Sequence, residues 1–351
     1  MSGNTIGEFF RVTTFGESHG KAIGVVIDGV TPGLALDESD IQIQLDRRKP
    51  GQSKITSPRR ESDTVQILSG VFEGKTTGTP LSMILYNTDQ QSGAYTHIRH
   101  AFRPGHADFT YQEKYGIRDY RGSGRASGRE TAGRVAAGAI AMKILSLRGI
   151  KIMAYTLRAG GITCEARDMD LIEKNPMRAC DMEAAAKMVS RIEEVQTRGD
   201  SVGGIVECRI TGVPSGLGEP VFDKLEAAIG KAVLSIGAVR GIEFGAGFRV
   251  ADMTGSQSND PIIPGGFSSN NSGGIIGGIS TGQEIIFRVP VKPAASISSE
   301  QHSTDDQGNP ITISTEGRHD PCICPRIVPV VESMCAIVLM DHIKRQSALH
   351  G

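Results

Sequence analysis

Three short segments of the chain set proton-carrying side chains beside glycine, proline or arginine. They are Gly16-Glu17-Ser18-His19-Gly20, Arg103-Pro104-Gly105-His106-Ala107-Asp108 and Arg318-His319-Asp320-Pro321. Glycine and proline favour rigid turns, and histidine changes its charge near neutral pH. If folding brings these segments together, His19, His106, Ser18 and Asp320 share one pocket with arginines. Such a set is suited to acid–base chemistry on a phosphate or a carboxylate.

A second chemical signal is a glycine-rich segment, Arg121 to Gly128, that leads directly into an expected helix at Glu130 to Leu147. Free N–H groups and the dipole at such a helix start attract phosphate, and arginine adds bidentate contacts. No Gly-Lys-Ser/Thr closes the segment, so it specifies neither ATP nor NAD. The glycines at 273–278 also lack the dinucleotide pattern. The arginines around the segment are Arg103, Arg121, Arg125, Arg129 and Arg134.

A basic stretch from Arg47 to Arg60 contains no acidic residue. Pro50-Gly51 and Ser57-Pro58 prevent one continuous helix, so we expect its cations on a loop that can converge on a ligand. A solvated surface loop or a non-specific RNA-binding loop would have the same composition.

The same residues also allow plainer interpretations. A histidine taken singly is often structural, and Ser18 or Asp320 could cap a turn. The six cysteines have no C-x-x-C spacing and predict reduced thiols, and no Cys/His ligand set indicates a metal.

Composition limits the class of protein. The 351 residues suffice for one large or two ordinary domains, and a hydrophobic fraction of 38% can supply a core. A net charge of −1 argues against a surface built for nucleic acid or an anionic membrane. Without an apolar leader or a span of about 20 apolar residues, we expect a soluble cytoplasmic protein.

The elements that must position these residues are short strands and two strongly apolar helices, at 130–147 and 328–344. Helices apolar on every side are buried between layers, so we expect antiparallel sheets on both faces in an α+β fold. Polar segments near 46–60, 87–100 and 296–317 are long enough for lids, although surface loops are an equal alternative. We expect strands at 10–14, 22–27, 64–68, 82–86, 151–157, 203–211, 242–244 and 284–289.

Two repeated patterns suggest internal duplication. Gly29-Val30-Thr31-Pro32-Gly33-Leu34 is echoed at 212–217, and Gly70 to Thr79 is echoed from Gly274 to Gln283; each is followed by a similar element. We infer two similar halves with a site between them, with chance repetition of turn motifs as the alternative.

Taken together, the motifs resemble a known family, chorismate synthase. The resemblance rests on Phe15 to Gly20, Phe102 to Arg121, Gly273 to Gly278 and Gly317 to Cys322, and runs in order from about Asn4 to Asp341. It implies conversion of 5-enolpyruvylshikimate 3-phosphate to chorismate and phosphate by an anti-1,4-elimination without net redox change. It also implies reduced FMN as cofactor, a β-α-β sandwich forming a single domain over 1–351, and a homotetramer. Since the chain is too short to add a reductase domain to its core, we expect an external flavin reductant, with NADPH as an indirect source of electrons.

The resemblance also implies roles for individual residues. By motif position, His106 corresponds to the histidine beside the reduced flavin and His19 to the one that protonates the departing phosphate. Asp320 corresponds to the aspartate that assists proton removal, with Ser18 as a relay. Candidates for the substrate's anionic groups are Arg48, Lys54, Arg129 and Arg134, the first two alternatively binding a nicotinamide nucleotide. Positions that match FMN-contacting segments are Arg125, Ala126, Ser127, Gly237, Ala238, Gly277, Lys292, Pro293, Ala294, Ala295, Ser296 and Arg318.

Overall fold

The computed structural model describes residues 3–57, 59, 61–89, 92–315 and 319–350. Two five-stranded sheets, both fully antiparallel, organise the chain. The first sheet has the order β1 (Thr5–Ile6), β2 (Arg11–Gly16), β3 (Ala22–Asp28), β7 (Leu81–Tyr86), β4 (Val65–Ser69). The second has the order β11 (Glu243–Phe244), β16 (Ile285–Val291), β10 (Gly204–Thr211), β8 (Lys151–Ala159), β9 (Ile162–Thr163).

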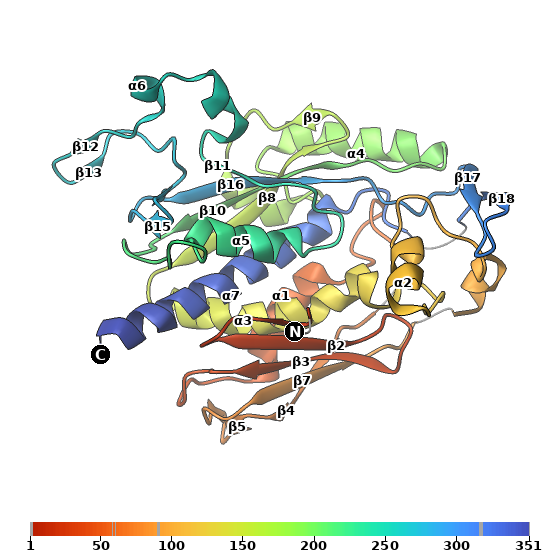
Figure 1. Cartoon of the computed structure of the whole chain (residues 1–351), viewed down its shortest axis with the longest axis horizontal. Helices are drawn as coiled ribbons and strands as arrows, with labels where there is room; N and C mark the ends of the chain where they lie inside the picture. Colours follow the sequence, from red (N-terminus) through yellow and green to blue (C-terminus); the bar gives the residue numbers. More distant parts are fainter. Residues whose placement is uncertain (1–2, 58, 60, 90–91, 316–318, 351) are drawn as a thin grey trace.

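Helices fill the space between these sheets (Figure 1). They are α1 (Glu38–Arg48), α3 (Thr131–Ser146), α5 (Leu225–Leu234) and α7 (Cys324–His350). The mixed helix and sheet content confirms the expected α+β class. The predicted strands and both apolar helices are present within a few residues of their expected bounds, apart from α7, which begins four residues earlier and runs six residues further.

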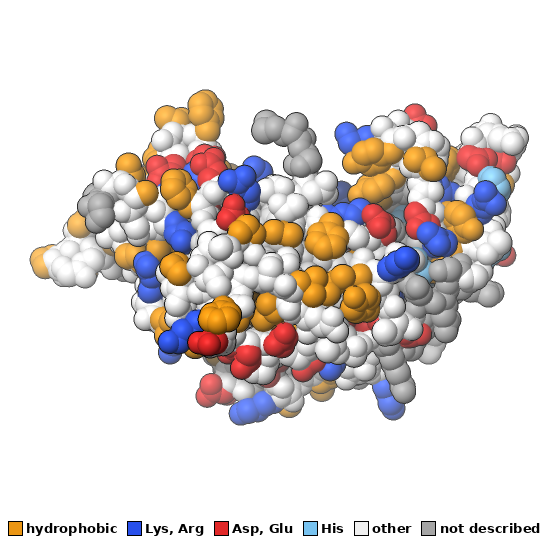
Figure 2. Space-filling view, turned by 90° about the horizontal axis from the view of Figure 1, so that it is seen from below, with side chains coloured by type: hydrophobic (Ala, Val, Ile, Leu, Met, Phe, Trp, Pro, Cys, Tyr) orange, Lys and Arg blue, Asp and Glu red, His pale blue; other side chains and the backbone are white. Residues whose placement is uncertain are grey.

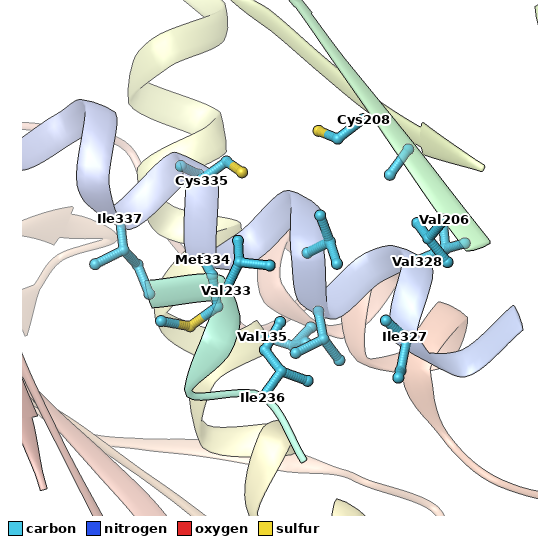
Figure 3. Packing of buried hydrophobic residues seen from close by; sticks show 14 of the residues in the cluster. Val135, Val206, Cys208, Val233, Ile236, Ile327, Val328, Met334, Cys335 and Ile337 are labelled. Carbon is cyan, nitrogen blue, oxygen red and sulfur yellow. The ribbon is translucent and has the colours of Figure 1, made fainter. Parts of the chain in front are cut away.

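The helical layer is closely packed because its helices carry small side chains where they meet. In Figure 3, Val328 and Cys335 of α7 lie on the side of that helix towards β10, which carries Cys208. On α3, Gly138 approaches α7 so closely that an added Cβ would lie 2.3 Å from the Cβ of Ser333. A larger residue at 138 would therefore force the two helices apart.

The remaining elements lie outside the two sheets and the helical layer. The small hairpins are β5 (Val71–Phe72) with β6 (Lys75–Thr76), β12 (Ile262–Ile263) with β13 (Gly266–Phe267), β14 (Ile275–Ile276) with β15 (Ile279–Ser280), and β17 (Gln301–Thr304) with β18 (Pro310–Ile313). The other helices are α2 (Asp108–Tyr115), α4 (Met182–Thr197) and α6 (Gly255–Ser258), with 3₁₀ turns η1 (Ser92–Ile98), η2 (Gly124–Ala126), η3 (Gly128–Glu130), η4 (Met169–Lys174) and η5 (Gly247–Asp252).

The three segments expected to be irregular contain regular structure. Arg47 and Arg48 form the last turn of α1, so a loop over all of 47–60 is wrong. The helix begins after a capping box of Asp37 and Asp40. It ends at Arg48, because the next residue, Lys49, precedes a proline and avoids the helical conformation. The other two segments contain η1 and the β17–β18 hairpin.

These last two segments also pack against each other and form a second core. It consists of Tyr95, Ile98, Ala101, Ile311 and Ile313. Backbone hydrogen bonds join them as well, since the N–H of residue 102 donates to the carbonyl of residue 304 over 3.1 Å. The segments 92–102 and 301–313, far apart in sequence, are thus one structural unit beside the main core.

Candidate active site

A cavity of about 850 Å³ brings distant segments of the chain together. Its walls include the C-terminal end of α1 and the N-terminal turns of α3 and α7. Two helix N-termini at one cavity favour anionic ligands. The volume falls in the range that holds a ligand of cofactor size. Predicted residues that line it are His19, Arg48, His106, Arg125, Ala126, Ser127, Arg129, Arg134, Gly237, Ala238, Lys292, Pro293, Ala294, Ala295, Ser296 and Asp320.

His19 lies in the turn between β2 and β3, and its Nδ1 is 3.0 Å from Oγ of the buried Ser18. The ring packs edge-on against Tyr95, with centroids 5.2 Å apart. On its other side is Gly122, which has a φ of +64° and whose Cβ, if present, would lie 2.3 Å from the imidazole. Glycine at 122 is therefore required for the ring to occupy this position.

The electrostatic surroundings of His19 keep it neutral in the free protein. Burial, followed by the positive charge of Arg59, lowers its pKa to about 4. Without a ligand, the pKa of His19 is thus well below neutrality. A bound anion opposes the effect of the arginines, because it stabilises the imidazolium.

His106 is held from both sides. Its Nε2 lies 2.6 Å from Oγ of Ser123, and its Nδ1 lies 3.0 Å from Oδ1 of Asp108, close but poorly aligned for a hydrogen bond. Burial lowers the pKa of His106 more than the Asp108 carboxylate raises it. Asp108 is itself fixed by Arg103, whose Nε and Nη2 donate to it over 2.7 and 2.8 Å. A neutral His106 beside this carboxylate favours the tautomer protonated at Nδ1.

Asp320 has both carboxylate oxygens engaged. Oδ1 accepts a hydrogen bond of 2.7 Å from the backbone N–H of Ser57, and Oδ2 pairs with Arg326 at the start of α7. Asp320 still lines the cavity. Thus the structure brings His19, His106 and Asp320 to one cavity, with Ser18 directly behind His19.

Cations surround this set. The eight that line the cavity among the described residues are Arg48, Arg59, Arg125, Arg129, Arg134, Arg240, Lys292 and Arg326. Acidic residues compensate most of them. Asp63 is buried and pairs with both Arg48 and Arg129, while Glu130 pairs with Arg134.

Two of the eight have no carboxylate partner among the described residues. Arg240 is exposed, and Nζ of Lys292 donates only to the carbonyl of Gly105, over 2.7 Å. They lie near each other, since burial and the charge of Arg240 both lower the pKa of Lys292. This flank of the cavity therefore carries an uncompensated positive charge.

The structure does not bring every predicted residue to the cavity. Lys54 is exposed and outside its lining, and Gly277 is exposed at the turn between β14 and β15. Arg318 lies outside the described residues. Beside the cavity, Ala238 has a φ of +75°. This conformation costs energy for a residue with a Cβ, and it recurs at ligand sites.

Sequence reasoning missed several residues of the site. His319 had a signal, because it directly precedes Asp320 in one of the three segments. Asp63 follows the basic stretch, but nothing in the sequence shows that it bridges two arginines. Arg240 and Arg326 belong to no motif and reach the cavity only through the fold.

The alternative functions receive little support from this geometry. Arg47, Arg48 and Arg59 of the basic stretch pair with Glu332, Asp63 and Glu61, so they are not free to follow an RNA backbone. Within the described residues, no group of His, Cys, Asp or Glu could hold a metal ion, and all six cysteines are buried and free. No helix found there is long and apolar enough to cross a membrane.

Comparison with known proteins now identifies the family. The family model described as chorismate synthase matches residues 10–344. The chorismate synthases of Syntrophus aciditrophicus (strain SB) and Desulfosudis oleivorans are 55% and 58% identical, each match covering 99% of both chains. A solved structure, "Crystal Structure of Chorismate Synthase", is 31% identical with a TM-score of 0.76, covering 97% of this chain and 93% of that one. With its cations and histidines gathered in one cavity, the chain belongs to the chorismate synthase family.

Proposed function

We propose that the chain converts 5-enolpyruvylshikimate 3-phosphate into chorismate and phosphate by an anti-1,4-elimination that depends on reduced FMN. The observation that carries this proposal is the single cavity lined by His19, His106, Asp320 and eight cations. The substrate has one phosphate and two carboxylates, and its elimination releases the phosphate and removes a ring proton. The cavity offers positive charge for the anions and separate groups for the two protons.

The cations divide into those that contact the substrate's anionic groups directly and those that only make the cavity more positive. Most N–H groups of Arg48 and Arg129 donate to Asp63, to Asn87 or to backbone carbonyls. Their side chains are 1% and 3% exposed, so their contribution is largely a fixed positive field. Arg59, Arg134 and Arg326 are more accessible, and we assign them the direct contacts with substrate anions. Lys54 remains a candidate only if the loop beyond α1 closes over the ligand.

The proton-handling roles follow from the positions of three groups. His19 would give a proton to the departing phosphate, since a neighbouring phosphate stabilises its protonated form. Ser18 can pass a proton to Nδ1 of His19 through their 3.0 Å contact. His106 would hold a proton beside the flavin, and Asp320 would help to accept the ring proton of the substrate.

The residues present fit a flavin in three respects. Arg240 and Lys292 form an uncompensated cationic flank suited to its phosphate. Next to them, an added Cβ at Gly237 would have its nearest neighbour 4.0 Å away, so backbone can approach a flat ring. Nε2 of His319 is buried and has no hydrogen-bond partner among the described residues. When bound, reduced FMN supplies an electron transiently to assist C–O cleavage. Ala126, Ser127 and residues 293–296 would complete its site, and Arg318 and Gly277 remain candidates from the family pattern.

The supply of electrons and the cellular setting are part of the same proposal. We expect a cytoplasmic enzyme that receives reduced FMN from a separate reductase, with NADPH as the indirect source. We also propose a homotetramer. In support, the outer face of the first sheet exposes Phe15, Leu68 and Tyr86 by 45%, 60% and 52%, and Figure 2 shows hydrophobic side chains across this face. Exposed apolar patches of this kind mark interaction surfaces. Light scattering on the purified protein tests the assembly.

We further propose a β-α-β sandwich built from two similar halves in one domain. The strand orders β2-β3-β7-β4 and β8-β10-β16-β11 correspond. Equivalent hydrogen bonds support the match: the N–H of Leu34 donates to Oγ1 of Thr76, and the N–H of Leu217 donates to Oγ of Ser280. One continuous core joins the halves. Separate expression of residues 1–150 tests whether the two halves form one domain, since a half that lacks its partner sheet should not fold.

The decisive test is an anaerobic assay with dithionite-reduced FMN and 5-enolpyruvylshikimate 3-phosphate. We expect chorismate to form with no net oxidation of the flavin. His19→Ala and His106→Ala should each lower turnover by about 100-fold or more, with FMN still bound. His302→Ala, an exposed histidine on β17, is the control. Wild-type protein that binds FMN but forms no chorismate would overturn the proposal, and salt-dependent RNA binding that tolerates His106→Ala would favour the RNA alternative.

A further inference from the structure

Two buried ring nitrogens of the cavity lack a hydrogen bond among the described residues, Nδ1 of His106 and Nε2 of His319. Nε2 of His319 is buried, and no described residue lies within hydrogen-bonding geometry of it. His319 lines the cavity beside Asp320. Buried polar atoms are nearly always hydrogen-bonded in folded proteins, and an exception at a binding cavity indicates a group that a ligand satisfies.

The neighbouring histidine does not offer the same opportunity. Both ring nitrogens of His106 lie close to other side chains, Ser123 and Asp108. The remaining buried atoms without partners among the described side chains belong to residues that do not line the cavity. His319 is thus distinguished from the other unsatisfied groups by its position.

The charge of His319 restricts the kind of ligand it suits. Burial and the nearby Arg103 lower its pKa to about 4, although Asp320 acts in the opposite direction. A neutral imidazole donates or accepts one hydrogen bond at Nε2 but neutralises no anion. The substrate's anionic groups are better served by the arginines. A neutral heterocycle with N–H and C=O groups on its edge is a better match.

We propose that His319 is a cofactor-binding residue whose Nε2 forms a hydrogen bond with the polar edge of the bound flavin ring. This inference rests on the proposed flavin dependence of the enzyme. It assigns the ring a position next to His106, and it separates the ring from the phosphate, which the cationic flank of Arg240 and Lys292 would hold.

The test is an equilibrium titration of the protein with oxidised FMN, followed by quenching of flavin fluorescence. His319→Leu should raise the dissociation constant about tenfold, the upper range for one neutral hydrogen bond. His319→Gln should stay within about threefold of wild type, because its amide reaches the position of Nε2. His319→Asn is polar but shorter and should behave like the leucine variant. His302→Leu, on the exposed surface of β17, is the matched control.

Each outcome bears on the assignment. Weaker FMN binding in the leucine and asparagine variants, with recovery in the glutamine variant, supports it. If the leucine variant does not fold, as judged by circular dichroism, the difference in FMN affinity between the glutamine and asparagine variants still tests the assignment. Unchanged FMN binding in all three variants overturns it, and unchanged binding with a raised KM for the substrate assigns His319 to the substrate instead. Wild-type protein that binds no FMN refutes the proposed function itself.

Discussion

Replacing Asp63 should destabilise the folded protein, because this residue holds two arginines of the candidate site. Its carboxylate is fully buried and bridges the guanidinium groups of Arg48 and Arg129, and its backbone has a φ of +49°. Asp63→Asn keeps the shape of the side chain but removes the negative charge. Arg48 would then have no carboxylate partner among the described residues, and Arg129 would keep only Glu61, 4.0 Å away.

The expected loss is large because the charges cannot return to water. Breaking a buried ion pair by removing one partner typically costs about 3 to 5 kcal/mol. We therefore expect Asp63→Asn to lower the free energy of unfolding by about that amount at pH 7. Asp46→Asn is the matched control on α1, where Asp46 pairs with Lys49 over 2.8 Å at the surface. An exposed pair of this kind contributes about 1 kcal/mol or less.

The effect should also depend on pH. Burial opposes ionisation of Asp63, but the charges of Arg48 and Arg129 outweigh it and hold its pKa below the ordinary value. Its contribution is therefore complete above about pH 4, the pKa of aspartate in an unfolded chain, and is lost as the pH falls towards the lower folded-state pKa. Wild type and Asp63→Asn should then converge in stability.

Urea unfolding followed by circular dichroism measures both effects, at pH 7 and at a series of lower values. The reasoning is refuted if Asp63→Asn loses no more stability than Asp46→Asn at pH 7. A difference between wild type and Asp63→Asn that grows as the pH falls below 4 would also contradict it.

Three further predictions concern other parts of the molecule. In NMR titrations of the free protein, the His19 ring should titrate near pH 4 because of burial and nearby arginines, and inorganic phosphate should raise that value; titration near 6.5 without ligand would contradict this. Asp341→Ala should lower the free energy of unfolding in urea by about 3 kcal/mol, since its carboxylate accepts three backbone N–H groups, and Asp341→Asn should lose less. Gly138→Ala should cost about 2 to 3 kcal/mol by forcing α3 from Ser333, whereas Gly255→Ala, with open space around it, should change the thermal midpoint little; equal effects would disprove the packing argument.

The elements of the fold were predictable where local patterns are strong. The apolar sequence of α7 predicts a buried helix and the short apolar run of β3 predicts a buried strand. Both elements are present, although α7 extends beyond its expected bounds at both ends. Arg47 and Arg48 were misplaced because the basic composition of the stretch obscured the end of an amphipathic helix. The capping box at Asp37 marked the start of that helix, and Pro50 marked its end.

The candidate site was predictable only in part. Its histidines lie in glycine-containing turns that can be recognised in the sequence, and the family motifs add the roles of Ser18 and Asp320. The charge balance of the arginines and the pKa of His19 depend on side chains that approach from other elements. Nothing in the sequence around Arg48 indicates that Asp63 accepts hydrogen bonds from its Nε and Nη2, and nothing near His19 indicates that burial and Arg59 make it a weak base.

The second core, which joins segments 92–102 and 301–313, has a consequence for solvent access to the site. Its contacts are few and interlocked, so neither segment can leave without exposing the buried side chains of the other. Local opening should therefore occur as one cooperative event, and the amide hydrogens of both segments should exchange at a common rate. Tyr95 belongs to this unit and also packs against His19. The same event that opens the second core would thus uncover the side of His19 that Tyr95 covers, which ties the solvent exposure of this histidine to the unfolding of a small separate unit.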